Sequence, residues 1–253
     1  MYETEYSGGR MLLGNVRASL TRDDAQLALR LVAHGVSRDL DEAETRLREE
    51  GIDVILDDPR LLTAIIGSRA GMQVSVNLFW YVVVRRAMLR VGEDDRALAD
   101  YVAAVLLHFG ARGRAERISE TDDQLFNTLS ELMGEVDTPD AKRSFLVRQH
   151  LGNFALWSSG MFPDRIEYKR WRRGGPDLDY YEEMGRRGFT LASEHRLAQE
   201  HGLDTLLRVA ANRFAALRCA LNEVSDTLMF PNVNSPERLM RQVRAEAAWR
   251  WAS

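Results

Sequence analysis

The sequence predicts an all-α protein of about ten helices in two packed lobes, similar to a helical bundle. Three observations predict this class. Capping residues and glycines recur at helix-length intervals, one long segment carries a helical apolar stripe, and no segment alternates convincingly between apolar and polar residues. No period of 20–50 residues repeats, which argues against a solenoid.

Helix start and stop signals recur through the first part of the chain. Thr21–Asp24 has the pattern of a capping box, and Gly35 is placed to end the helix that it starts. Asp39–Glu42 repeats the start signal, with Gly51 as the stop. Asp58–Pro59 then combines an N-cap residue with proline at the first helical position. These signals predict three successive helices.

Two longer helices are expected next. Ser75 can cap a helix that runs to about Arg90, although the run Val82–Val84 is also compatible with a strand. Asp94 opens the following helix, and Gly110 ends it. The strand alternative stays open because periodicity alone does not separate a short apolar strand from a buried helical segment.

The second half of the chain carries the clearest helical pattern. Apolar residues from Leu206 to Leu228 step by three and four, which is typical of a helix that faces a core. Around this segment, start and stop signals predict helices at residues 121–135, 138–159, 163–173, 179–201 and 235–251. The polar break Ala111–Glu120 separates an N-terminal lobe, residues 1–110, from a C-terminal lobe, residues 121–253. Because the break is short, the two lobes could also form a single domain.

The composition is that of an ordinary globular protein. The chain has 253 residues, of which 45% are apolar and 28% charged, so it can bury a core and is not generally disordered. Its single cysteine, Cys219, excludes an intrachain disulfide and a multi-cysteine metal site. The net charge of −4 does not favour binding to nucleic acid or to an anionic membrane.

No segment is typical of secretion or membrane insertion. The N-terminal residues lack a basic start followed by an apolar run. The most apolar stretch, Val74–Val84, is far shorter than the ~20 residues that span a bilayer. We therefore expect a cytoplasmic protein.

The segment Gln149–Ser193 is dense in glycine, aromatic residues and arginine. It contains four short motifs, Leu151-Gly152-Asn153, Ser159-Gly160-Met161-Phe162-Pro163, Asp179-Tyr180-Tyr181 and Met184-Gly185. With these motifs, about a fifth of the chain resembles a family of uncharacterised bacterial helical proteins. The resemblance implies a bacterial origin and a helical core. The family has no established activity, so the resemblance implies no catalytic residues.

Two interpretations of this segment are open. In the first, Gly152 and Gly185 let two helices cross closely, because glycine inside a helix costs about 0.5–1 kcal/mol and needs a compensating contact. In the second, the segment forms a ligand pocket. The side chains expected to line that pocket are Asn153, Trp157, Tyr180 and Tyr181.

Motifs for enzyme chemistry are absent or loose. Phosphate-binding glycine motifs, Gly-x-Ser-x-Gly and the Glu-x-x-His pairs of di-iron helices do not occur, so we expect no cofactor and no metal. Arg143 and His150 are similar to the signature of HEPN-type ribonucleases, at its longest spacing. Such an arginine could stabilise a phosphorane and the histidine could transfer a proton. A metal-independent ribonuclease, paired across a dimer, is therefore an alternative function.

Two basic stretches are candidates for binding a partner. The first contains Arg165, Lys169, Arg170, Arg172 and Arg173, with Tyr168 and Trp171 between them. The second contains Arg238, Arg241, Arg244 and Arg250, with Trp249 and Trp251 near its end. Aromatic residues among arginines suit single-stranded nucleic acid or an acidic protein. The net negative charge favours the acidic protein, and the terminal tryptophans could pack against a second copy of the chain.

The leading hypothesis is therefore a non-enzymatic interaction or regulatory protein that self-associates and binds an acidic protein partner. The alternatives are the ribonuclease and the small-molecule pocket in the glycine-rich segment.

Overall fold

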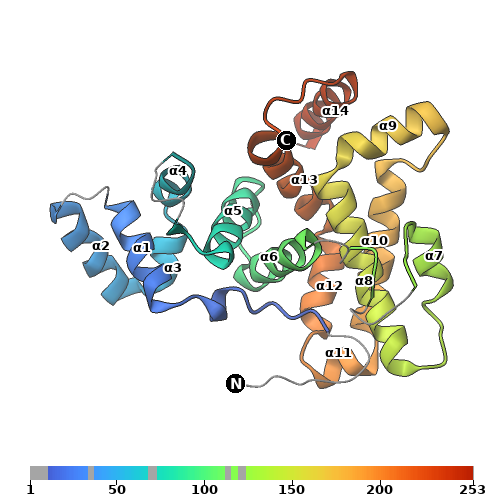
Figure 1. The fold of residues 1–253 in the computed structure, drawn as a ribbon, viewed down its shortest axis with the longest axis horizontal. Helices are drawn as coiled ribbons and strands as arrows, with labels where there is room; N and C mark the ends of the chain where they lie inside the picture. The colour runs from blue at the N-terminus through green and yellow to red at the C-terminus, as the bar shows by residue number, and fades with distance from the viewer. Residues whose placement is uncertain (1–10, 34–36, 68–72, 112–114, 119–123, 253) are drawn as a thin grey trace. The chain divides into compact units, whose positions relative to one another are not determined.

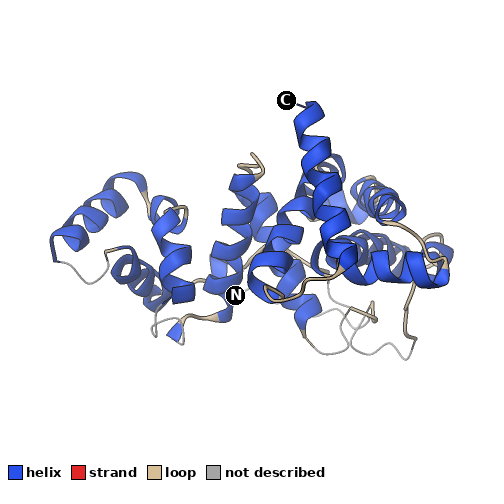
Figure 2. Cartoon of the chain, turned by 90° about the horizontal axis from the view of Figure 1, so that it is seen from above, coloured by secondary structure: helices blue, strands red, loops and turns tan. Residues whose placement is uncertain are grey.

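The computed structural model describes residues 11–33, 37–67, 73–111, 115–118 and 124–252. Every regular element in these residues is helical, and none is a strand (Figure 2). The all-α class is therefore confirmed. The chain divides into two compact units, Leu12–Gly110 and Ala111–Ser253, and Met11 belongs to the second of them.

Among the described residues of the N-terminal unit, Leu12–Gly110, the named elements are a 3-10 turn and six α-helices. These elements are η1 (Arg17–Ser19), α1 (Arg22–Val32), α2 (Ser37–Glu50), α3 (Ile52–Leu56), α4 (Pro59–Gly67), α5 (Val76–Arg90) and α6 (Arg96–Gly110). Helix α1 packs against α2, α3 and α4, and α5 packs against α6 (Figure 1).

Side-chain caps fix the starts of several of these helices. The Thr21 hydroxyl accepts a hydrogen bond from the Asp24 backbone N–H at 3.2 Å, and the Asp24 carboxylate accepts one from the Thr21 N–H at 2.8 Å, which confirms the capping box. The Ser75 hydroxyl caps α5 through the Leu78 N–H. Gly51 ends α2 with a φ of +84°, which glycine adopts readily. The stop expected at Gly35 lies outside the described residues.

The strand alternative for Val82–Val84 is wrong. These three residues lie in the middle of α5 and are almost completely buried. A helix that is covered on several sides has no polar stripe, so its sequence pattern resembles that of a buried strand. The Ser75 cap is the local signal that distinguishes the two.

The second unit contains the helices that follow Ala111. Its elements are α7 (Leu129–Gly134), α8 (Ala141–Met161), α9 (Pro163–Arg173), α10 (Leu178–Ser193), α11 (Arg196–Glu200), α12 (Asp204–Asn212), α13 (Phe214–Val224), the π-helical turn η3 (Ser225–Met229) and α14 (Pro236–Ala252). Helix α8 contacts α7, α9, α10, α11 and α13, and its most extensive packing is against α10 (Figure 1).

Glycines make the close crossing of α8 and α10 possible. A Cβ atom on Gly188 would lie 2.5 Å from the backbone nitrogen of Gly152, and one on Gly152 would lie 2.5 Å from the Phe189 ring. A Cβ on Gly185 would lie 2.1 Å from the ring of Phe214. A Cβ on Gly188 would overlap backbone, and one on Gly152 or Gly185 would force a buried aromatic ring to move, so the glycines serve helix packing.

The described chain contains fourteen α-helices rather than about ten. The segment predicted as one helix at residues 179–201 is split into α10 and α11, and Leu206–Leu228 is split into α12, α13 and η3. A short break preserves the three-and-four spacing of apolar residues, so the pattern does not reveal it. Helix α7 begins at Leu129 with Thr128 as its cap, and the start expected at residues 121–123 lies outside the described part.

Candidate functional site

Helix α9 is the clearest candidate for a binding surface in the second unit. Pro163 occupies its first turn, and Gly174 ends it in a left-handed conformation with a φ of +64°. Pro163, Ile166 and Glu167 are buried against the neighbouring helices α8, α10 and α14. The opposite side of α9 is exposed.

The exposed side of α9 is basic. Its side chains are Arg165, Tyr168, Lys169, Arg172 and Arg173, which we call the α9 basic face. Their spacing of three, four, seven and eight residues places them on one side of the helix, over a length of about 12 Å. Tyr168 is 48% exposed, and Trp171, at the edge of this face, is 62% exposed.

The four cations of the α9 basic face have no ion-pair partner within the described residues. Arg170, which lies off this face, differs from them, since its guanidinium nitrogens lie 3.9 Å from carboxylate oxygens of Glu167 and Asp177. The Arg172 guanidinium lies 5.9 Å from the centre of the Tyr168 ring, a cation–π distance. The face therefore presents four positive charges to solvent.

The carboxylates of α9 point the other way and are neutralised inside the unit. Glu167 is buried, accepts a hydrogen bond from the Trp171 indole N–H at 3.2 Å, and lies 3.7 Å from the Arg244 guanidinium. The Asp164 carboxylate accepts hydrogen bonds from Arg238 at 2.8 Å and Arg241 at 3.0 Å. The two carboxylates of α9 and the four cations of the α9 basic face thus lie on different sides of the helix.

The second basic stretch does not form the exposed basic surface that the sequence suggested. Arg238 and Arg241 are only 5% and 8% exposed. Both contact Asp164 of α9 and Asp226 of η3, at distances from 2.7 to 3.4 Å. Because buried charges need partners, these arginines attach α14 to the rest of the unit. The side chains of Trp249, Arg250 and Trp251 lie outside the described part of the chain.

The two residues of the ribonuclease hypothesis lie on α8. The Arg143 guanidinium is 3.4 Å from the side-chain oxygen of Gln124. His150 is 5% exposed, its Nε2 lies 3.0 Å from the Ala115 carbonyl oxygen, and its ring stacks on Phe154. Only a protonated Nε2 can donate to a carbonyl, so this contact orients the ring inward. The geometry gives the ribonuclease hypothesis no support.

The four side chains expected to bind a ligand have different surroundings. Asn153 is buried in α8, whereas Trp157, Tyr180 and Tyr181 are half-buried. The Trp157 ring packs edge-on against Phe162, and the two tyrosine rings pack edge-on against each other. Burial raises the pKa of the Tyr181 hydroxyl; neighbouring Tyr180 adds to the shift, and Arg165 opposes it. Ligand binding by these four residues stays a prediction.

Within the residues that the structure describes, no group of three His, Cys, Asp or Glu side chains could hold a metal ion. No helix in the same residues has the length and hydropathy needed to cross a membrane.

Comparison of the chain with protein-family models, with curated proteins and with solved structures gave no match. The resemblance of residues 149–193 to a bacterial helical family therefore stays a prediction.

Proposed function

We propose that this protein is a non-enzymatic interaction module that binds an acidic segment of a protein partner through the α9 basic face. The observation that supports this most strongly is the separation of charge on α9. Its carboxylates are paired within the unit, whereas four cations that pair with no described carboxylate lie together with an exposed tyrosine on the outside. Such a face complements a short acidic segment.

Two further observations favour a protein over a nucleic acid. The whole chain has a net charge of −4, which opposes the approach of a polyanion that extends beyond α9. The face also covers only about 12 Å, or two turns of helix. Nucleic-acid-binding proteins commonly make six to ten phosphate contacts, about twice what four cations supply.

The test compares binding of two labelled polyanions to the full chain by fluorescence anisotropy. One is a glutamate-rich peptide, and the other is a single-stranded oligonucleotide of equal charge. The test variant replaces Arg165, Lys169, Arg172 and Arg173 by Gln. The control variant replaces four exposed arginines elsewhere, Arg30, Arg48, Arg196 and Arg208, by Gln, so that both variants have the same net charge.

We expect the α9 variant to lose peptide affinity and the control to keep it. An exposed ion pair contributes about 0.5 kcal/mol, so four contribute about 2 kcal/mol, roughly a thirtyfold loss in affinity. Equal losses in both variants would show that net charge, and not α9, governs binding. Tighter binding of the oligonucleotide than of the peptide would favour a nucleic-acid partner instead.

Self-association is the second part of the proposal. Helix α14 exposes three apolar side chains on one side, Leu239, Met240 and Val243, with exposed fractions of 50–62%. An exposed apolar stripe of this kind commonly packs against another protein surface. Native mass spectrometry of the full chain tests this part, and a Val243→Glu variant that leaves the mass distribution unchanged would exclude α14 as the contact.

A further inference from the structure

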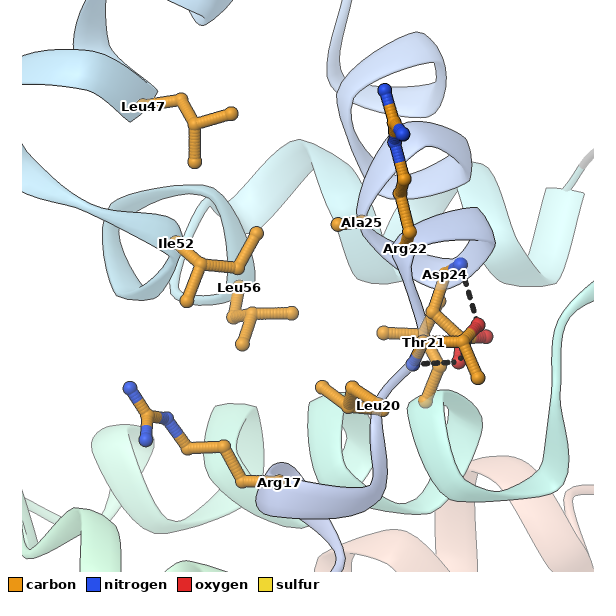
Figure 3. Close-up of a pocket in the computed structure, with 10 residues that line it drawn as sticks. Arg17, Leu20, Thr21, Arg22, Asp24, Ala25, Leu47, Ile52 and Leu56 are labelled. Carbon is orange, nitrogen blue, oxygen red and sulfur yellow. Dashed lines mark hydrogen bonds between the residues drawn. The ribbon is translucent and has the colours of Figure 1, made fainter.

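The N-terminal unit contains a cavity of about 370 Å³ that is partly open to solvent (Figure 3). It lies beside α1, and its wall includes side chains from the η1–α1 segment, α2, α3 and α5. Five of these side chains are large and aliphatic: Leu20, Leu47, Ile52, Leu56 and Leu78. Ala25 of α1 adds a small apolar side chain to the same wall. The volume is within the range of small-molecule sites.

Two of the three charged residues that line this cavity are already paired. The Asp24 carboxylate accepts hydrogen bonds from the backbone N–H and the hydroxyl of Thr21, at 2.8 and 2.9 Å. Arg17 donates two hydrogen bonds to the Asp53 carboxylate, at 2.8 and 2.9 Å. The Asp24 carboxylate is thus held by neutral hydrogen-bond donors, and the Arg17 guanidinium is already paired with a carboxylate.

The third charged residue, Arg22, is different. Its side chain is exposed, and within the described residues it makes no ion pair. It occupies the first position of α1, where the helix dipole disfavours a positive charge. Neither a carboxylate partner nor the helix dipole explains an arginine at this position, and the residue lines the cavity together with the aliphatic side chains.

We infer that this cavity binds an aliphatic carboxylate, with the hydrocarbon chain among the leucine and isoleucine side chains and the carboxylate at Arg22. The side chains of this partly open pocket are mostly aliphatic, so a hydrocarbon chain that lies among them removes apolar surface from water. A single available guanidinium complements one negative charge. The ligand class is thus a singly charged amphiphile and not a polyanion.

The first test is calorimetric titration of the full chain with decanoate and with decanol, below the concentrations at which either aggregates. The two ligands share a chain length and differ in charge. We expect both to bind, and decanoate to bind about fivefold more tightly because of its exposed contact with Arg22. Failure of both to bind would overturn the inference.

Two kinds of variant locate the site. Arg22→Gln should remove the preference for decanoate and leave decanol binding unchanged, whereas Arg30→Gln, two turns further along α1 and not part of the cavity wall, should keep the preference. Ala25→Phe and Leu47→Trp enlarge side chains on two different helices of the wall, and each should abolish binding of both ligands. Circular dichroism melting identifies whichever of these two variants keeps the wild-type fold, and binding is judged on that variant.

The inference is independent of the proposed function, and the two can fail separately. The α9 variant should bind decanoate as the wild type does. Unchanged decanoate binding in Ala25→Phe and Leu47→Trp, together with loss in the α9 variant, would show that the carboxylate binds the α9 basic face and would overturn the cavity assignment.

Discussion

The α8–α10 crossing and the α9 basic face lie within the same short glycine-rich, aromatic and basic segment, yet the two regions use their residues in opposite ways. At the crossing, Gly152, Gly185 and Gly188 bring helices and aromatic rings into contact, and the glycines have no room for a side chain. On α9, the cations contact no described carboxylate and point to solvent. The unusual composition of this segment therefore has two separate causes. Its glycines allow α8 and α10 to pack closely, and its basic residues on α9 are exposed to solvent.

This comparison predicts that a substitution at the crossing affects stability far more than one on α9. Replacing Gly188 by Val should have the largest effect, because its Cβ would overlap the backbone of α8, which cannot rotate away as a side chain can. We expect a loss of about 4–5 kcal/mol in the free energy of unfolding. Urea denaturation followed by circular dichroism measures it.

A matched glycine serves as the control for this prediction. Gly134 is the last residue of α7, has no positive φ, and has no heavy atom within 4 Å of the place where its Cβ would stand. Gly134→Ala should therefore change stability by less than about 1 kcal/mol. A Gly188→Val protein as stable as the wild type would show that the crossing is not as close as described.

An intermediate effect is expected where α14 attaches to α9. Arg241→Met removes one of the two guanidinium groups that contact Asp164 and Asp226, and leaves Arg238 as the cation that the structure shows in contact with both carboxylates. An uncompensated buried charge costs about 3 kcal/mol. Arg244→Met, on the same helix but half-exposed, should cost less than about 1 kcal/mol. Equal effects in the two variants, measured by denaturation, would contradict a buried ionic attachment.

The sequence predicted those features whose causes are local. Each helix end of this kind depends on residues within about one turn of it. Examples are the caps at Thr21 and Ser75, the start of α9 at Pro163 and its end at Gly174. The α9 basic face was also predictable, since the spacing of its cations along a single helix decides that they share a side.

Features that depend on distant residues were missed. Arg238 and Arg241 have the same local pattern as the α9 cations, and only folding reveals that Asp164, more than 70 residues earlier, neutralises them. The cavity of the N-terminal unit was missed for a similar reason. Each of its aliphatic side chains, such as Leu20 and Leu47, has the pattern of an ordinary core residue, and the space between them depends on how α1, α2, α3 and α5 pack.

The smallest effects are expected on the α9 basic face, and their signs should differ along the helix. Neighbouring cations at a spacing of three or four residues repel each other by about 0.2–0.5 kcal/mol per pair. A cation near the helix N-terminus is further disfavoured by the helix dipole, whereas one in the last turn is favoured by about 0.3–1 kcal/mol. Arg165 lies in the first turn of α9, and Arg173 is its last residue.

Arg165→Gln should therefore stabilise the protein by about 0.5 kcal/mol, and Arg173→Gln should destabilise it by a similar amount. Replacing all four cations together should leave the free energy of unfolding within about 0.5 kcal/mol of the wild type. The repulsion between the cations is removed, but so is the favourable interaction of Arg173 with the helix dipole, and the two effects offset each other. Denaturation at low and high salt measures these differences, which should shrink as the Debye length falls below the spacing of the charges. A loss of several kcal/mol in the free energy of unfolding of the fourfold variant would mean that these cations stabilise the unit itself. It would contradict the view that they are available to bind a partner.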